Sequence, residues 1–127
     1  MARVTFSQED INRSKLVAPG WYPLKVTKFQ EDQAGTDGSA LYVYEVKINA
    51  GPFKDVPMRY QISEKAIGMG VDFVEACGFP VQAGVPLELE KCVGKDIEGF
   101  VQRGEYNGRP QNNLVQFRKP KGIEAKA

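Results

Sequence analysis

The amino-acid sequence predicts a mainly β fold of five strands, with one helix between the third and the fourth strand. Thirteen Gly and eight Pro divide the 127 residues into short segments, which is typical of β structure with many turns. Several of these segments alternate apolar and polar side chains with the period of two of a strand. One longer segment has the apolar spacing of an amphipathic helix. The length suits one domain with its own core.

The first half of the chain contains three expected strands. Residues 1–19 precede them as an N-terminal arm or short helix, which Ser7 can cap. The strands are expected from Trp21 to about Gln30, from Ala40 to Asn49 and from Val56 to Ile62. The side chains expected to face the core are Tyr22, Leu24 and Val26 of the first strand and Val56, Met58, Tyr60 and Ile62 of the third. On the second strand, one face contains Tyr42, Tyr44, Val46 and Ile48, and the other contains Leu41, Val43, Glu45 and Lys47. On the first strand, the opposite face contains Trp21, Lys25, Thr27 and Phe29.

The register of the second strand stays open, because both of its faces begin with apolar residues. In one register, Tyr42 and Tyr44 face the core. In the other, a bulge near the middle of the strand places Leu41 and Val43 inside and frees both tyrosines. The third strand is expected at an edge or at a bulge, because Pro57 lacks an amide donor.

The second half of the chain contains the expected helix and two more strands. Ser63 can cap a helix over residues 64–77, and a glycine follows at the position where helices often end. A short helical turn is expected over residues 86–93. The last two strands are expected over residues 96–103 and 113–118. The side chains expected to face inward are Ala66, Gly70, Phe73, Val74 and Cys77 of the helix, and Val115 and Phe117 of the last strand.

The hairpin between the last two strands is the most informative local motif. Asn107-Gly108 favours a type I′ turn, in which both central residues have φ > 0. The turn would hold Arg103, Tyr106 and Arg109 together. Cations suit phosphate and an aromatic face suits a base, so this tip is a candidate contact for single-stranded nucleic acid. The alternative is an ordinary solvated hairpin, since turns are usually polar.

Composition limits the chemistry that this chain can perform. Histidine is absent, which removes the commonest general base and transition-metal ligand. Cys77 and Cys92 lack zinc-ligand spacing, so buried thiols are expected, and a disulfide between them stays open. No acidic pair or phosphate-binding loop has the spacing that catalysis requires. We therefore expect neither an enzyme, a metal site nor a cofactor.

Charge and hydropathy bear on partners and location. The formal net charge is only +1, which is weak support for a dedicated duplex binder but compatible with a local basic groove. No charged-then-apolar leader opens the sequence, and no apolar run approaches the roughly 18 residues of a membrane span. The expectation is a cytoplasmic protein that does not bind membranes.

The order of elements is that of an OB-fold, a five-stranded Greek-key barrel with a helix between strands three and four. Such a domain would span residues 20–119, after the arm and before a disordered tail over residues 120–127. OB-folds usually bind ligands on strands two and three and on two flanking loops, which here are residues 31–38 and 103–112. This step is an analogy of fold.

Five short motifs, in this order, resemble the small single-stranded-DNA-binding proteins encoded by phages and prophages. They are Pro19-Gly20-Trp21-Tyr22, Gly51-Pro52-Phe53-Lys54, Ala76-Cys77-Gly78, Val93-Gly94-Lys95 and Tyr106-Asn107-Gly108, within roughly residues 17–118. The resemblance implies an OB barrel that protects single strands during phage replication or recombination, in the cytoplasm of the bacterial host. Cellular relatives commonly end in an acidic tail, whereas this C-terminus is basic.

Two functions follow as hypotheses. The first is binding of single-stranded DNA, with other replication or recombination proteins and a second copy of the chain as further candidate partners. The second is an OB-fold protein-interaction or assembly module without a nucleic-acid ligand. The candidate nucleic-acid-binding residues are Trp21, Lys25, Tyr42, Tyr44, Lys47, Phe53, Lys54, Arg59, Arg103, Tyr106 and Arg109. Arg59 is the strongest single candidate, and its alternative role is to protect an edge strand from aggregation.

Overall fold

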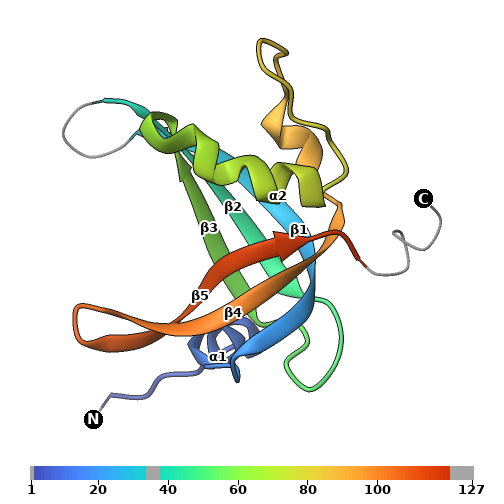
Figure 1. Cartoon of the computed structure of the whole chain (residues 1–127). Coiled ribbons are helices and arrows are strands. Elements are labelled where there is room, and N and C mark those ends of the chain that lie inside the picture. The colour runs from blue at the N-terminus through green and yellow to red at the C-terminus, as the bar shows by residue number, and fades with distance from the viewer. Residues whose placement is uncertain (1, 34–37, 121–127) are drawn as a thin grey trace.

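Five antiparallel strands form one strongly curled sheet in the order β3-β2-β1-β4-β5 (Figure 1). They are β1 (Gly20–Gln33), β2 (Ala40–Ile48), β3 (Pro57–Ser63), β4 (Asp96–Tyr106) and β5 (Arg109–Arg118). This computed structural model describes residues 2–33 and 38–120, apart from the side chain of Tyr106. The predicted mainly β fold with a short helix before the fourth strand is confirmed.

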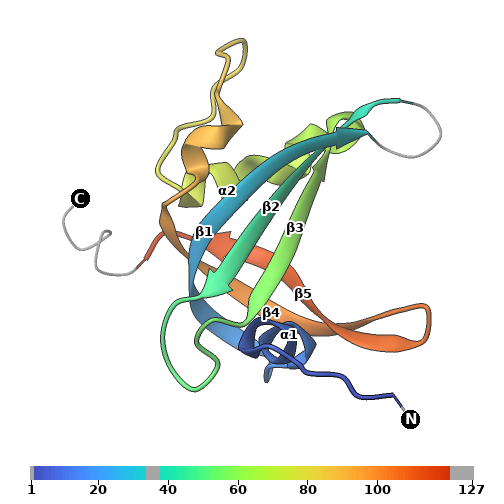
Figure 2. The same cartoon turned by 180° about the vertical axis from the view of Figure 1, so that it is seen from behind.

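The N-terminal helix α1 (Gln8–Ser14) begins at the predicted cap. The Ser7 hydroxyl accepts a hydrogen bond of 3.1 Å from the Asp10 amide, and the Asp10 carboxylate accepts one of 3.0 Å from the Ser7 amide. This reciprocal arrangement is a capping box, which pairs two amides that the helix leaves without partners. The helix lies beside the start of β3 (Figure 2).

A bulge in β1 changes which side chains face the core. The register with β2 shifts between Val26 and Lys28, so Thr27 is the extra residue. Beyond the bulge, Phe29 packs against the core, and Lys28 lies opposite Glu45 on the outer face. The expectation that Phe29 shares the outer face is therefore wrong, because strict alternation ends at Thr27.

The register of β2 is the one that buries its aromatic side. Its pairing with β3 runs without a shift, and Tyr44 is completely buried. A bulge within β2, which would have freed Tyr44, is absent from the described pairing. β3 is an edge strand, as Pro57 predicts.

The predicted helix over residues 64–77 is divided into a 3₁₀ helix, η1 (Glu64–Gly70), and helix α2 (Val71–Ala76). The Ser63 hydroxyl caps η1 by accepting from the Lys65 amide at 3.3 Å. Ala66 has non-helical φ/ψ of −126° and 40° and is exposed, so its predicted inward position is wrong. The physical reason is local, because two glycines weaken this half of the helix by roughly 1 kcal/mol each. Gly70 also packs closely, since a Cβ there would lie 2.6 Å from Ile62 Cδ1.

The second half of the chain otherwise follows the expected order. The predicted helical turn is the 3₁₀ helix η2 (Leu89–Cys92). β4 and β5 continue to the turn, where Asn107 and Gly108 have φ of 52° and 77°, as a type I′ turn requires. The pairing of β5 with β4 skips Val115, which is 48 % exposed, so its predicted inward position is wrong. Leu114 and Phe117 pack against the core.

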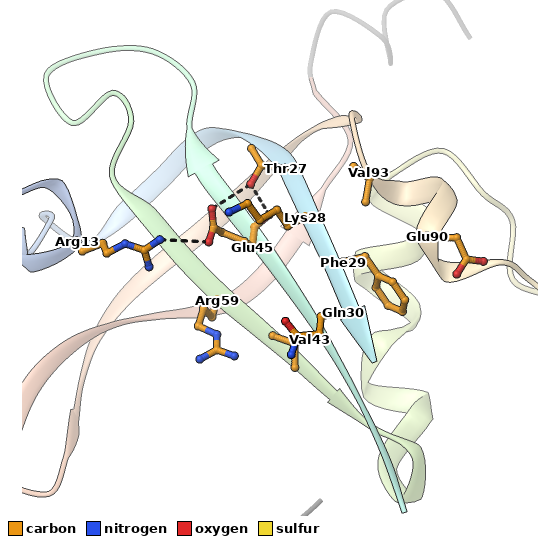
Figure 3. Close-up of a pocket in the computed structure, with 10 residues that line it drawn as sticks. All are labelled: Arg13, Thr27, Lys28, Phe29, Gln30, Val43, Glu45, Arg59, Glu90 and Val93. Atoms are coloured by element: carbon orange, nitrogen blue, oxygen red, sulfur yellow. Dashed lines mark hydrogen bonds and ion pairs between the residues drawn. The ribbon is translucent and has the colours of Figure 1, made fainter. Parts of the chain in front are cut away.

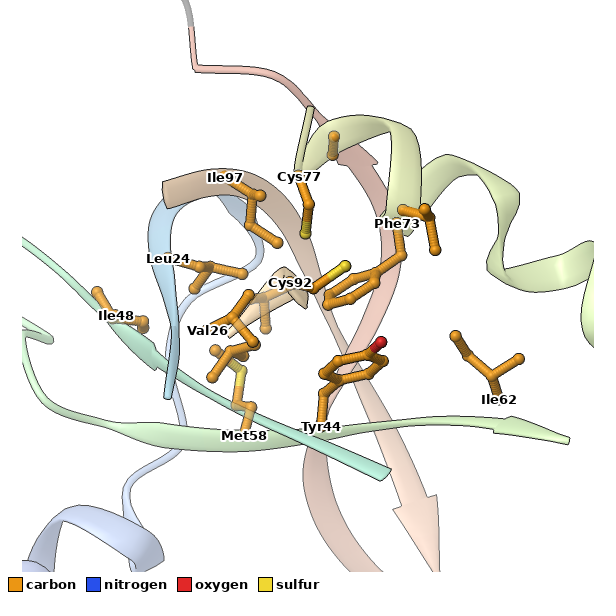
Figure 4. Close-up of a cluster of buried hydrophobic side chains, with 14 of the residues drawn as sticks. Leu24, Val26, Tyr44, Ile48, Met58, Ile62, Phe73, Cys77, Cys92 and Ile97 are labelled. Carbon is orange, nitrogen blue, oxygen red and sulfur yellow. The ribbon is translucent and has the colours of Figure 1, made fainter. Parts of the chain in front are cut away.

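The core fills the concave side of the sheet and the space under α2 (Figure 4). Its largest completely buried side chains are Tyr44, Phe73, Leu24, Ile48 and Ile97. Cys77, which follows α2, and Cys92 of η2 meet there, and both are buried free thiols, as expected. The hydrogen bond with Cys92, together with burial, raises the pKa of the Cys77 thiol.

Aromatic side chains connect the two edge strands. The rings of Tyr60 on β3 and Phe117 on β5 lie 4.6 Å apart, and Phe73 of α2 lies 5.0 Å from each of them. Over the described residues, β3 and β5 have no strand pairing with each other. The sheet is thus open in its hydrogen bonding, and side chains fill the gap.

Candidate nucleic-acid interface

Four cations lie around Glu45 on the outer side of β1, β2 and β3, and we call this patch the cationic face; Asp96 of β4 lies opposite Lys25 at its margin. The register aligns Lys28 of β1 with Glu45 of β2, and Glu45 with Arg59 of β3. In the adjacent row, Lys25 pairs with Lys47. Opposite side chains on one face of a sheet have Cβ atoms about 5 Å apart, so these charges form a compact patch. Lys25, Lys28 and Arg59 are exposed, whereas the two residues on β2 are half-buried.

Glu45 lies at the centre of this face and has partners of its own. Its carboxylate lies 3.7 Å from Arg13 Nη2 of α1. The Thr27 hydroxyl donates to the main-chain oxygen of Glu45 at 3.1 Å and to its carboxylate at 3.4 Å. Figure 3 shows these contacts around a pocket that Lys28 and Arg59 also line. Over residues 2–33 and 38–120, neither of these two cations has an ion pair, so both can meet an external anion.

Tyr44 does not belong to the interface. Its side chain is completely buried, and its ring lies 4.6 Å from that of Phe73. Its hydroxyl donates to the Leu89 carbonyl at 2.7 Å. Burial raises the pKa of this hydroxyl well above its ordinary value. The prediction that Tyr44 contacts a base is therefore wrong, because the inward register of β2 places its ring among core side chains.

Tyr42 and Phe53 are half-buried and pack against the core rather than on the cationic face. The Tyr42 ring is stacked on Phe29, with centroids 6.3 Å apart and planes inclined by 17°. Phe53 meets Tyr22 edge-on at 6.0 Å. Both candidate aromatics thus have partners within the fold, and neither presents a platform beside the four cations.

Trp21 lies on the outer side of the sheet, but on the half formed with β4 and β5. It pairs with Phe100 and contacts that ring edge-on at 5.5 Å. The Arg118 guanidinium lies 3.9 Å from the centroid of the indole ring, and Arg118 also donates to Glu98 at 2.6 Å. One face of Trp21 is therefore occupied by a cation that the protein itself supplies.

The hairpin and one turn contribute further cations away from the cationic face. Arg103 and Arg109 are exposed near the β4–β5 tip, which extends beyond the rest of the sheet (Figures 1 and 2). Lys54 is exposed in the turn between β2 and β3. Tyr106 pairs with Arg109 through the backbone, and its side chain lies outside the described residues. The structure thus separates the candidate cations into those of the cationic face, those of the hairpin and that of the turn.

Two cations near Glu45 were not among the predicted residues. Lys28 has the same parity as the buried Leu24 and Val26, and only the bulge turns it outward. A lysine at a position of core parity is itself a sequence signal for such a bulge. Arg13 comes from α1, about thirty residues before Glu45, and no local pattern predicts that contact.

Among the described residues, no three His, Cys, Asp or Glu side chains form a cluster that could hold a metal ion. No helix in the described part of the chain has the length and apolar character needed to cross a bilayer. Neither known protein-family models nor curated proteins match this chain.

Proposed function

We propose that this protein binds single-stranded DNA without strong sequence preference and contacts phosphates through the cationic face. The observation that carries the proposal is the row formed by Lys28, Glu45 and Arg59, in which two exposed cations flank an acid that already has partners. Lys25 and Lys47 extend the patch by one row. A positively charged surface that follows the sugar–phosphate backbone is one of the two features of sequence-tolerant single-strand binders.

The arrangement of the strands supports an OB-fold as the basis of this function. The element order matches that fold, and the aromatic contacts between β3 and β5 lie where an OB barrel would close. OB-folds bind oligonucleotides on strands two and three and on the loop between strands four and five. Here those places correspond to the cationic face and to the hairpin with Arg103 and Arg109.

The second feature of such binders, an exposed aromatic platform, is not found on the cationic face among the described side chains. Tyr42 and Phe53 pack against the core, and Trp21 is covered on one side by Arg118. Tyr106 on the hairpin is the candidate that the sequence supplies for stacking. We therefore propose binding dominated by phosphate contacts, which makes the affinity strongly dependent on salt. A role in phage replication or recombination, in the host cytoplasm, rests on the family resemblance, and a function without catalysis rests on the residue types and their spacing.

A protein-interaction or assembly module is the second candidate. It is favoured by the net charge of only +1 and by the engagement of the candidate aromatics within the fold. On this hypothesis, the cations of the outer face would meet acidic side chains of a protein partner rather than phosphates.

Fluorescence anisotropy with labelled oligo-dT, oligo-U and duplex DNA at two or more salt concentrations distinguishes the two functions. The proposal expects binding of oligo-dT at low salt, with weaker binding of a duplex of equal length. If all four cations of the face neutralise phosphates, the slope of log K against log salt is about −2.8, from about −0.7 per phosphate. Absence of oligo-dT binding at low salt would overturn the proposal and favour the interaction module.

A further inference from the structure

Helix α1 lies at one end of the cationic face but is held there weakly. None of its residues is buried. It lies against β3, and its Arg13 reaches the central Glu45 at 3.7 Å (Figure 3). Arg13 also pairs with Glu9 of its own helix at 2.8 Å. Ion pairs between exposed or half-exposed groups contribute little to stability, so these contacts position the helix without fixing it firmly.

The chain immediately after α1 is anchored much more strongly. The Asn112 side chain of β5 donates to the Lys15 carbonyl at 2.9 Å and accepts from the Val17 amide at 3.0 Å. Val17 is completely buried. Lys15 has extended backbone angles of −73° and 133°, so the helix ends there. A helix without buried residues is thus joined to a fixed anchor, and this geometry allows α1 to leave the sheet while residue 17 remains in place.

The charge of α1 matches that of a ligand for the cationic face. Its first turn contains Glu9 and Asp10. The hydrogen bond and charge of Arg13 lower the pKa of Glu9, and the charges of Lys47 and Lys28 lower it further. Glu9 of α1 therefore lies within the electrostatic field of two cations of the face, while the contact of α1 with the face is made by Arg13 at Glu45.

We propose that α1 is a displaceable strap, which occupies part of the cationic face in the unbound protein and leaves it when single-stranded DNA binds. The inference rests on the proposed function and adds a regulatory element to the same site. Displacing α1 costs free energy, and this cost lowers the affinity for DNA. The affinity therefore depends on how stable α1 is on the sheet. Displacement also separates Arg13 from Glu45, which adds to the cost of binding.

The first test measures the motion of α1 directly in the full-length protein. Backbone ¹⁵N relaxation and heteronuclear NOE values for residues 8–14 are compared with and without oligo-dT. Displacement predicts that these residues become more mobile on binding, while Val17 stays rigid. If resonances of the cationic face shift but α1 keeps or gains order, the strap is refuted and the proposed function stands. If no resonance responds to oligo-dT at low salt, the proposed function fails, and the strap fails with it.

The second test alters the helix without altering any charge. Ser7→Ala removes the capping hydroxyl that the Asp10 amide uses and weakens α1 without touching the cationic face. Loss of such a cap typically favours the displaced state by about fivefold, so we expect oligo-dT binding to tighten by about two- to fivefold. Thr5→Ala is the matched control, because it removes an exposed hydroxyl upstream of the helix. Unchanged or weaker binding in Ser7→Ala, relative to Thr5→Ala, would overturn the proposal.

Discussion

Replacing Arg59 by Ala tests the central contact of the cationic face. Arg59 is exposed on an edge strand, opposite Glu45. Over the described residues it has no ion pair that a truncation would break. We therefore expect the free energy of unfolding to change by no more than about 0.5 kcal/mol. A large fall in melting temperature would show that Arg59 is structural.

The expected loss of affinity follows from counterion release. The binding constant for single strands varies with salt concentration to the power of about −0.7 for each neutralised phosphate. If Arg59 neutralises one phosphate, its removal lowers the binding constant about fivefold at about 0.1 M salt and only about twofold at about 0.3 M. The fivefold loss corresponds to about 1 kcal/mol. The slope of log K against log salt becomes less steep by about 0.7.

The assay is fluorescence anisotropy of labelled oligo-dT, repeated over a series of salt concentrations. Lys95→Ala is the matched control, because it also removes one positive charge. The Lys95 ammonium lies 5.4 Å from the ring centroid of Phe79, just after α2, and not in the rows of the cationic face. We expect its slope to equal that of the unaltered protein. An unchanged slope in Arg59→Ala would refute the phosphate contact, and equal losses in both variants would show that only net charge matters.

Two further predictions concern stability. Gly99→Ala would place a Cβ 2.6 Å from Cδ1 of the completely buried Leu24, so overpacking should cost about 1–3 kcal/mol; an unchanged urea midpoint would contradict this. Tyr44→Phe leaves the Leu89 carbonyl without its 2.7 Å hydrogen bond and should cost about 1–3 kcal/mol near neutral pH. Burial raises the pKa of Tyr44 in the folded protein. The protonated hydroxyl therefore stabilises the fold below about pH 10, the pKa of tyrosine in the unfolded chain, and this stabilisation is lost as the pH rises above that value. Thermal melts from about pH 9 to 12 should therefore show a steeper alkaline loss in the unaltered protein than in Tyr44→Phe, and parallel losses would refute that assignment.

Sequence patterns predicted correctly those elements that depend only on interactions between neighbouring residues in the chain. The capping of α1 by Ser7 depends on hydrogen bonds between residues three positions apart. The turn at Asn107 and Gly108 depends on the φ values that these two residue types tolerate. The alternation of β3 was also correct, because an edge strand without a bulge keeps the period of two along its length. In each case, the information lies within a few consecutive residues.

The errors on β1 and β5 occurred where the pairing between strands decides which side chains face the core. Beyond the bulge at Thr27, the side chains of β1 exchange the inner and outer faces of the sheet, and the same happens on β5 beyond the skipped residue Val115. A bulge is a mismatch between two strands, and neither strand's own pattern determines its position. The same reason explains why Phe29 was assigned to the wrong face and why Lys28 was overlooked.

The sequence by itself determined which residue types could meet a phosphate or a base, and that a mainly β scaffold would carry them. Only the tertiary structure decided which of these side chains share a surface. Strand register brought Lys28, Glu45 and Arg59 into one row, core packing withdrew Tyr44, and the path of the N-terminal chain brought Arg13 to Glu45. The physical reason is that burial and charge proximity depend on contacts between residues far apart in the chain, which no local periodicity encodes.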